Sequence, residues 1–220
     1  MADIHVDAVI FDLDGVLIDS EAVWAEVRRE FTLARGGHWS EGTERKMIGM
    51  SSPEWARFMH EELGVDLEPE AISAAVADEM TKRYRQRLPL LPGAVDSVRG
   101  LADRWPLGLA SSANRPLIDL ALEEAGLATQ FRVTLSTEEV GRGKPAPDVY
   151  LEAARRLSVA PAHCVGVEDS TNGIRALAGA GMRIVAVPNR DFPPDREVLE
   201  SADIVISSLD ELTPGLIERL

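Results

Sequence analysis

The chain has 220 residues, of which 45% are hydrophobic and 27% are charged, as in an ordinary globular protein. Its formal net charge of -14 and its pI of about 4.7 argue against nucleic acid or an anionic membrane as a partner, because both bind basic surfaces. No stretch reaches the roughly 18 apolar residues of a membrane span, and the single Cys164 excludes an intramolecular disulfide and suits a reducing compartment. We therefore expect a cytoplasmic protein with one large domain, or with a core and a smaller insertion.

The first predicted element is a buried strand that ends in two acidic residues. Residues 6–11 are apolar and rich in β-branched side chains, with Asp7 as the one charge, and such a run is typical of a strand. Asp12 and Asp14 follow it, and Gly15 then allows a sharp turn. Because ligands bind outside the carboxyl ends of strands in open α/β sheets, we expect both carboxylates in the active cleft. The alternative is a simple turn after the strand, where Asp and Gly are common.

The spacing of these two carboxylates indicates different roles. Carboxylates this close repel each other unless one is protonated or a cation lies between them. Asp12 suits a magnesium ligand and a nucleophile that attacks phosphorus, and Asp14 suits an acid that exchanges a proton with the leaving oxygen. A calcium loop of the EF-hand kind is excluded, because Val16 stands where that motif requires a third ligand.

Helical patterns fill the next part of the chain, which contains no convincing strand. The predicted helices cover residues 20–35, with an N-cap at Ser20, then residues 51–63 and 69–87. We expect residues 21–91 to form a small all-helical unit, inserted into a larger core of residues 1–20 and 92–220. Its two junctions are natural hinges.

From residue 91 onward, predicted helices and strands alternate. The predicted strands are residues 107–110, 131–135, 165–167, 184–187 and 204–206, and the predicted helices are residues 94–104, 116–125, 147–157 and 173–180. Strands separated by helices of about ten residues indicate βαβ units and a parallel sheet. The predicted fold class is therefore α/β, with the all-helical unit inserted after the first strand. Cys164 stands in one of the apolar runs, and we expect it in the core rather than as a reactive thiol.

Polar residues follow several predicted strands at the point where each strand ends. Besides the two aspartates, they are Ser111, Ser112, Glu168 and Asp169, and Lys144 opens a nearby loop. Because the carboxyl ends of parallel strands lie along one edge of a sheet, we expect these residues to meet. Each also has a structural alternative. Ser111 and Asn114 would cap a helix, Lys144 would be a solvated cation, and residues 168–170 would form a helix N-terminus.

The combination suits the binding of a phosphoryl group, whose transfer depends mostly on positioning and electrostatics. Ser111 would hydrogen-bond one phosphate oxygen, and the backbone amides of Ser112 and Ala113 would help near a helix start. Asn114 is a further candidate for phosphate binding. Lys144 would neutralise the charge that develops in the reaction and would keep the nucleophile ionised.

A magnesium site is predicted from the same set of residues. Asp169, Asp12 and the backbone carbonyl of Asp14 offer the few hard oxygen ligands that Mg²⁺ takes while it keeps several waters. Glu168 is a fourth candidate, which would act through a bound water or would orient Lys144.

The order and form of these motifs resemble those of the haloacid dehalogenase superfamily. The residues that carry the resemblance are Asp12-x-Asp14-Gly15-Val16, Ser111, Lys144-Pro145 and Glu168-Asp169-Ser170. The Lys-Pro-x-Pro-Asp form at residues 144–148 and the Val-Glu-Asp-Ser form at residues 167–170 are similar to its sugar-phosphate branch, which contains β-phosphoglucomutase and hexose or hexitol phosphate phosphatases. The resemblance covers essentially the whole chain and implies a Rossmann-like core with a helical cap domain after the first strand. It also implies Asp12 as nucleophile, Asp14 as acid/base, and Mg²⁺ on Asp12, Asp14 and Asp169.

Three cap positions depart from the mutases of that branch. Trp24 stands where the mutases usually carry a histidine, and Ile48 and Ser52 replace two cations. A mutase must hold a sugar bisphosphate, whose second phosphate needs positive partners from the cap, so these changes favour a phosphatase. The cap cations available in their place are Arg45, Lys46, Lys82 and Arg83. Trp24 either stacks on a sugar face or packs within the cap.

The other function classes fit the sequence less well. A dehalogenase does not need Asp14, and a phosphonate hydrolase of this kind needs a cap lysine for a Schiff base, which is not identifiable. A non-catalytic phosphate-binding module would have lost at least one catalytic or metal residue, and all of them are present. We therefore predict a monomeric, magnesium-dependent phosphatase that hydrolyses a small sugar or polyol phosphate through an aspartyl-phosphate. The expected partner is a small phosphorylated metabolite, with no nucleic acid and no membrane.

Overall fold

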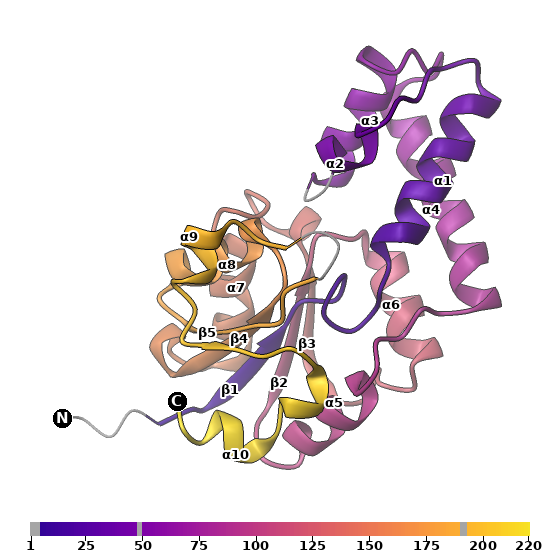
Figure 1. The fold of residues 1–220 in the computed structure, drawn as a ribbon. Helices are drawn as coiled ribbons and strands as arrows, with labels where there is room; N and C mark the ends of the chain where they lie inside the picture. Colours follow the sequence, from indigo (N-terminus) through magenta and orange to yellow (C-terminus); the bar gives the residue numbers. More distant parts are fainter. Residues whose placement is uncertain (1–4, 48–49, 190–192) are drawn as a thin grey trace.

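The computed structural model describes residues 5–47, 50–189 and 193–220. Its centre is a six-stranded parallel sheet with the order β3-β2-β1-β4-β5-β6 (Figure 1). The strands are β1 (Ala8–Phe11), β2 (Leu107–Ser111), β3 (Phe131–Ser136), β4 (Cys164–Glu168), β5 (Arg183–Ala186) and β6 (Ile204–Val205). The first strand of the chain therefore lies in the middle of the sheet, between β2 and β4.

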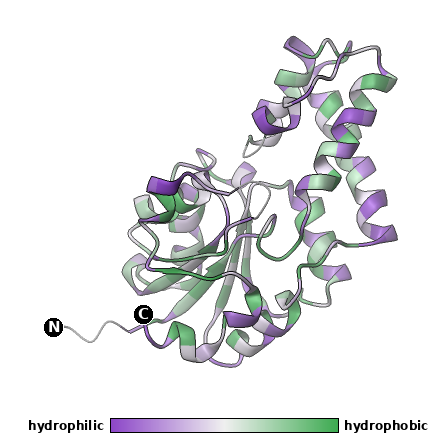
Figure 2. Ribbon diagram, in the orientation of Figure 1, coloured by the Kyte–Doolittle hydropathy of each residue, from purple (hydrophilic) through white to green (hydrophobic). Residues whose placement is uncertain are grey.

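The central strands are buried along their whole length, because helices cover both faces of a parallel sheet. Every residue of β1, β2 and β4 is buried. At the end of β1, Phe11 is in register with Leu109 of β2 and Val167 of β4. Hydrophobic residues are accordingly concentrated in the strands (Figure 2). The parallel register brings the carboxyl ends of these strands to one edge of the sheet.

Two layers of helices cover the sheet (Figure 1). One face packs against α7 (Asp148–Leu157), α8 (Thr171–Ala180) and α9 (Arg196–Leu199), and the other against α5 (Ala94–Ala102), α6 (Arg115–Glu124) and α10 (Pro214–Ile217). Ile10 packs in the core on the α7 and α8 side of the sheet, and Phe11 packs in the core on the α5 and α6 side. Successive residues of a strand point to opposite faces. This arrangement confirms the predicted α/β fold with a parallel sheet.

The remaining helices form an all-helical unit that stands beside the sheet (Figure 1). They are α1 (Glu21–Ala34), α2 (Thr43–Met47), α3 (Ser52–Glu61) and α4 (Pro69–Gln86). The longest, α4, packs against α1 and α3, and its buried residues are Ile72, Val76, Met80 and Tyr84. We keep the division into a cap domain of residues 21–91 and a core of residues 1–20 and 92–220 as a proposal.

The two connections between the helical unit and the sheet run side by side. Ile18 and Leu90 form an antiparallel bridge, and the Asp19 N–H donates to the Pro89 carbonyl at 2.7 Å. Both crossings therefore pass through one short paired segment, which is where the sequence predicts the hinges.

Three short helices, α2, α9 and α10, are not predicted from the sequence. Each has only four or five residues, which is less than the window of about 11 residues in which helical periodicity is read. Among the described residues, no helix is long and apolar enough to cross a membrane.

Candidate active site

The predicted site residues gather at the carboxyl ends of β1, β2 and β4, in the middle of the sheet, where the strand order reverses. Open α/β sheets bind ligands at such a switch point. A cavity of about 610 Å³ lies there, within the usual size of a small-molecule site. The core contributes Asp12, Asp14, Lys144 and Asp169 to its lining, and the helical unit contributes Trp24, Arg28, Arg45 and Trp55.

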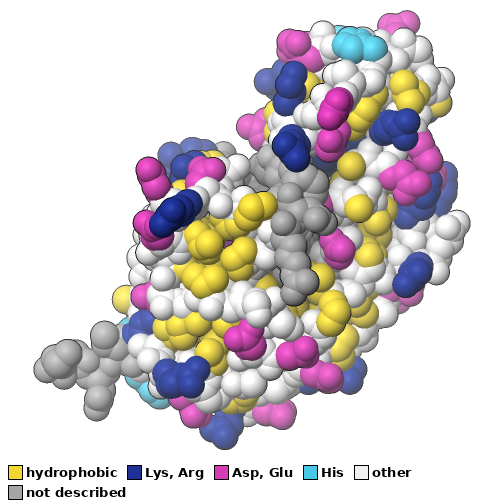
Figure 3. Space-filling view, in the orientation of Figure 1, with side chains coloured by type: hydrophobic (Ala, Val, Ile, Leu, Met, Phe, Trp, Pro, Cys, Tyr) yellow, Lys and Arg dark blue, Asp and Glu magenta, His cyan; other side chains and the backbone are white. Residues whose placement is uncertain are grey.

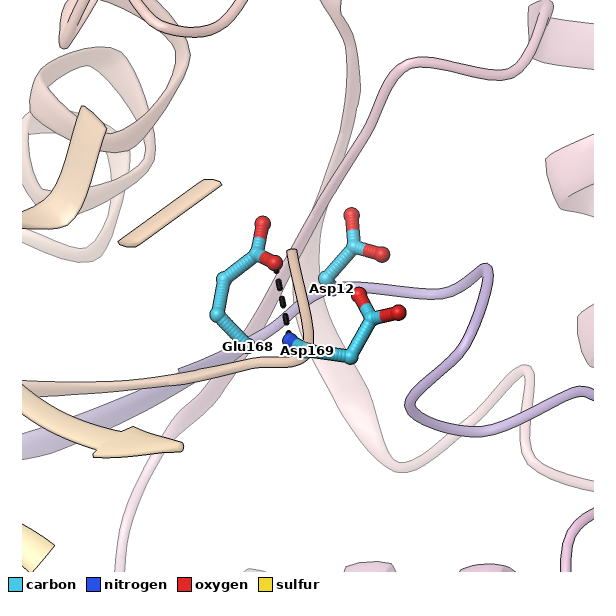
Figure 4. Close-up of side chains that lie close together, drawn as sticks. All are labelled: Asp12, Glu168 and Asp169. Atoms are coloured by element: carbon cyan, nitrogen blue, oxygen red, sulfur yellow. Dashed lines mark hydrogen bonds between the residues drawn. The ribbon is translucent and has the colours of Figure 1, made fainter. Parts of the chain in front are cut away.

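Three carboxylates form an acidic cluster at this edge (Figure 4). Asp12, Glu168 and Asp169 place carboxylate oxygens within 4.8 Å of one another, and all three residues are buried. The Asp12 N–H donates to the Val167 carbonyl at 3.0 Å, which continues the register of β1 and β4. The pairing of these two strands thus sets the spacing of the cluster.

Lys144 is the cation beside this cluster. Its Nζ lies 2.5 Å from Asp12 Oδ1 and 2.6 Å from Glu168 Oε1, and it donates to the Ala110 carbonyl at 3.0 Å. Only 5% of its side chain is exposed, so the alternative of a solvated loop cation is wrong. Burial alone lowers the pKa of Lys144, but the charges of Asp12 and Glu168 outweigh burial and raise the pKa above its usual range.

Both carboxylate oxygens of Glu168 accept hydrogen bonds. Oε1 accepts from Lys144 and from the Tyr150 hydroxyl at 2.7 Å. Oε2 accepts from the Asp169 N–H at 3.0 Å and from the N–H and hydroxyl of Ser170. Burial raises the pKa of Glu168, but Lys144 and these donors outweigh burial and lower it. This saturation suits the orienting of Lys144 better than direct metal binding.

Asp12 and Asp169 are the better candidates for metal ligands. The Asp169 carboxylate accepts no hydrogen bond from the described residues, and burial together with Glu168 and Asp12 raises its pKa well above the usual range. Burial also raises the pKa of Asp12 to about 8, against the opposing charge of Lys144. One lysine therefore faces three buried carboxylates. A hard divalent cation fits this oxygen donor set and its excess of negative charge.

The Asp14 carboxylate lies outside the acidic cluster and has its own donors. Oδ1 accepts from the Ser20 hydroxyl at 2.5 Å and from the Trp24 indole at 3.3 Å, and Oδ2 accepts from the Ser111 hydroxyl at 3.2 Å. Ser20 stands at the N-cap of α1, as predicted, but its side chain makes no capping hydrogen bond. The Ser20 hydroxyl instead donates its hydrogen bond to Asp14.

The loop after β2 carries the predicted phosphate-binding residues. Ser111 is fully buried, and its hydroxyl accepts from the Ala113 N–H at 3.0 Å. Ser112 and Ala113 line the cavity. Asn114 stands at the N-cap of α6 without a side-chain capping bond, and it is not among the residues that line the cavity.

The cap cations that the sequence suggests as replacements lie in different places. Arg45 lines the cavity, whereas Lys46 does not. Arg83 pairs with Glu26, Glu30 and Glu79, and Lys82 pairs with Glu79, all outside the cavity. Of the two positions that depart from the mutases, Ser52 lines the cavity and Ile48 lies outside the described residues.

Trp24 does more than pack within the helical unit. Its ring lies 6.1 Å from that of Trp55, measured between centroids, and its indole N–H reaches Asp14. The Trp24 side chain therefore both packs within the helical unit and contacts Asp14 of the site.

Ser20, Tyr150 and Arg28 are among the residues of the site that sequence reasoning misses. Ser20 reads as an ordinary helix cap, and Tyr150 and Arg28 read as parts of amphipathic helices. Arg28 lines the cavity and Tyr150 binds Glu168, but neither stands in a motif. Only the tertiary packing of α1 and α7 reveals them.

A buried lysine beside an acidic cluster, at the switch point of a parallel α/β sheet, is the arrangement of a metal-assisted hydrolase. Residues 6–181 match the haloacid dehalogenase-like hydrolase family, and the chain belongs to this family. This match confirms the predicted superfamily.

The relatives support the same class of enzyme. Hexitol phosphatase B of Escherichia coli (strain K12) is 34% identical over 213 residues, which cover 94% of this chain and 94% of the relative. The bifunctional riboflavin kinase/FMN phosphatase of Arabidopsis thaliana is 32% identical over 203 residues, which cover 91% of this chain but only 53% of that protein. The predicted class of phosphoric monoester hydrolase is confirmed.

The fold is similar to that of CbbY from Rhodobacter sphaeroides. Its crystal structure in complex with phosphate matches with a TM-score of 0.87 at 27% identity and covers 98% of this chain and 100% of that one. A mutant of the same protein in complex with xylulose-(1,5)bisphosphate matches with a TM-score of 0.84 at 28% identity, over 94% of this chain and 96% of that one.

Proposed function

We propose that the chain is a magnesium-dependent phosphatase that hydrolyses a small sugar or polyol phosphate through an aspartyl-phosphate on Asp12. The observation that carries this proposal is the separation of the two aspartates. Asp12 belongs to the acidic cluster and accepts a hydrogen bond from Lys144. The Asp14 carboxylate lies outside the cluster and accepts hydrogen bonds from three neutral donors. A nucleophile and a proton carrier need different surroundings, and these two have them. The name of hexitol phosphatase B supports the substrate class.

In the first step, an Asp12 oxygen attacks the phosphorus atom of the substrate. The bond between phosphorus and the sugar oxygen breaks, and the leaving oxygen takes a proton from Asp14. The sugar or polyol then departs as a neutral alcohol, and Asp12 carries the phosphoryl group.

In the second step, water attacks the phosphorus atom of the aspartyl-phosphate. Asp14, now ionised, accepts the proton of the water, and the bond between phosphorus and Asp12 breaks. Inorganic phosphate leaves, and both aspartates return to their starting protonation states.

The other residues hold the reacting groups in place. Asp12, Asp169 and the backbone carbonyl of Asp14 would hold Mg²⁺, which when bound neutralises charge on the phosphate oxygens. Lys144 favours the ionised form of Asp12, and the Ser111 hydroxyl donates to Asp14 and orients it. We take a monomer as the working unit and residues 21–91 as its cap, because one chain lines the cavity from both sides.

A mutase of the β-phosphoglucomutase type is the second candidate. Such an enzyme returns the phosphoryl group from Asp12 to another oxygen of the sugar and therefore needs cap cations for a second phosphate. The two arginines that line the cavity from the helical unit, Arg28 and Arg45, favour this alternative.

The test is phosphate release from a panel of sugar, polyol and nucleoside phosphates, with magnesium and with a chelator. β-Glucose 1-phosphate is assayed in parallel for conversion to glucose 6-phosphate. We expect magnesium-dependent release, which the Asp12→Asn variant should lower by on the order of 10⁴-fold while it stays folded. Isomerisation without net release would favour the mutase, and turnover by Asp12→Asn would contradict the nucleophile.

A further inference from the structure

Arg28 is a buried cation of the helical unit that faces the cavity. It lies on α1, it is only 8% exposed, and it belongs to the cavity lining. Its guanidinium carbon lies 4.7 Å from the ring centroid of Trp24 and 4.9 Å from that of Trp55. Both rings line the same cavity, so two aromatic walls hold the guanidinium in place.

No described residue compensates this charge by direct contact. Arg28 Nε is buried without a hydrogen-bond partner among the described residues, which also form no ion pair with the guanidinium. Glu21 and Asp14 are the acidic groups that act on it, through space only. Burial lowers the pKa of Arg28 to about 10, so it keeps its charge at neutral pH. Buried arginines are normally paired, which makes an unpaired one beside a cavity a place for an anion.

Arg45 also lines the cavity, but it is exposed, and other arginines of the helical unit have partners or lie in solvent outside the cavity. Arg83 pairs with Glu26 and Glu30, and Arg35 is exposed and stacks on Phe31 with its guanidinium carbon 3.5 Å from the ring centroid. Figure 3 shows acidic and basic side chains interspersed on the surface of this unit. Arg28 therefore does not belong to a general basic surface.

Arg28 makes no direct contact with the two aspartates or with Lys144. Its guanidinium stacks on the Trp24 ring, whose indole N–H reaches Asp14, and it forms no ion pair with a described carboxylate. At the sheet edge, Lys144 and Ser111 contact Asp12 and Asp14, which are the residues proposed to react with the phosphate, and neither contacts Arg28. An anion at Arg28 is therefore a different group from the phosphate that is transferred.

We propose that Arg28, held between Trp24 and Trp55, binds an anionic group at the end of the substrate away from the reacting phosphate. The substrate is then a phosphorylated sugar derivative with a second acidic group, a carboxylate or a second phosphate, rather than a neutral hexose or hexitol monophosphate. This inference rests on the proposed function, because it names the substrate class of the same cavity.

The first test measures binding without turnover. The Asp12→Asn protein is titrated with glucose 6-phosphate, 6-phosphogluconate and glucose 1,6-bisphosphate, and the fluorescence of the tryptophans beside Arg28 reports the binding. These ligands differ mainly at carbon 1, which is neutral in the first and acidic in the other two. We expect at least one acidic ligand to bind about 10- to 100-fold more tightly than glucose 6-phosphate. Equal affinities would overturn the proposal, and the preferred acidic ligand would identify the group as carboxylate or phosphate.

The second test assigns the preference to Arg28. In the Asp12→Asn background, Arg28→Met keeps an apolar stem between the rings and should reduce the preference to about twofold or less. Arg28→Lys should retain part of it. The matched control is Arg35→Met, which removes a stacked arginine at the C-cap of the same helix, outside the cavity, and should keep the full preference. A preference for acidic ligands that survives Arg28→Met would overturn the proposal. If that variant does not fold, the affinities of the three ligands for the Asp12→Asn protein, which retains Arg28, still test the proposal.

Phosphate release by the unmodified enzyme separates this inference from the proposed function. Release from neutral monophosphates, with no preference for acidic ones, would overturn the inference and leave the phosphatase standing. Tight binding of acidic ligands with no release from any of them would overturn the phosphatase and leave the anion site standing.

Discussion

The carboxylate of Asp169 occupies the space beside the Cα of Gly15. Any residue other than glycine at position 15 would place its Cβ in that space. Gly15 has a φ of +84°, and a Cβ there would collide with Asp169 Oδ2. Gly15→Ala should therefore cost about 1–2 kcal/mol for the backbone conformation alone. It should also move Asp169 and lower kcat by on the order of 100-fold, as a displacement of about 1 Å in a catalytic site does. Urea unfolding and steady-state kinetics measure the two effects.

The matched control for this change is Gly36→Ala. Gly36 has a similar φ of +74°, but no atom lies within 4 Å of the position of its Cβ. The variant should lose a similar free energy of unfolding, about 1–2 kcal/mol, and should keep its kcat. Equal losses of kcat in both variants would mean that backbone strain, and not the displacement of Asp169, explains the effect.

Magnesium should stabilise the folded chain through Asp12 and Asp169. A ligand at 100 times its Kd adds about 2.7 kcal/mol to the free energy of unfolding, which is roughly 5–10 °C in Tm for a chain of this size. Asp169→Asn removes one ligand charge and should abolish most of this shift. Differential scanning fluorimetry with MgCl₂ and with a chelator measures it.

The control for the metal prediction is Asp119→Asn on α6. The Asp119 side chain is 61% exposed and pairs with Arg115 outside the cavity. This variant should keep the full magnesium shift. A shift that is the same in both variants would place the cation elsewhere on the acidic surface.

The sheet and the motif residues are predictable from the sequence for one reason. In parallel strands such as β1 and β4 the residues are apolar up to the carboxyl end, so the polar residues at that end, Asp12 after β1, Glu168 at the end of β4 and Asp169 after it, are recognisable in the sequence. Parallel topology then requires these strand ends to lie along one edge. Lys144 is predictable as a candidate, but its burial against Asp12 and Glu168 is not, because a lysine in a loop is usually solvated.

The residues that hold the site together are not predictable in this way. Ser20 has the local signal of a helix cap, and only the fold shows that its hydroxyl turns to Asp14. Arg28 reads as part of the polar face of α1, and only the packing of α3 against α4 places Trp55 beside it. The direction of the Ser20 hydroxyl and the position of Trp55 both depend on how the chain packs, so neither contact can be predicted from a local sequence pattern.

Cys164 should be inert in the folded protein. Its residue is fully buried, and burial raises the pKa of the thiol to about 11. At pH 8 the thiolate fraction should be at least about 100-fold lower than in the unfolded chain, where the pKa is about 8.5. Iodoacetamide labelling, followed by mass spectrometry with and without urea, should show this difference in rate.

The raised pKa of Cys164 also has a consequence for stability at high pH. A group whose pKa is higher in the folded state contributes stability below its unfolded pKa and loses it as the pH rises through the folded value. The free energy of unfolding should therefore fall between about pH 8.5 and pH 11. Cys164→Ala should remove this part of the pH dependence in urea titrations. An unchanged slope in that variant would assign the effect to other groups.

Ser20 should act on the reaction through Asp14. Its hydroxyl is one of three donors to the Asp14 carboxylate, at 2.5 Å from Oδ1, so Ser20→Ala should misorient the acid and lower kcat on a sugar phosphate by about 10-fold. On p-nitrophenyl phosphate, whose leaving group needs no proton, the loss should be about twofold or less. Thr213→Ala, which removes the capping hydroxyl of the distant α10, should cost about 1 kcal/mol of stability and leave kcat unchanged on both substrates. Equal losses on the two substrates for Ser20→Ala would mean that Ser20 supports the fold of the site and not proton transfer by Asp14.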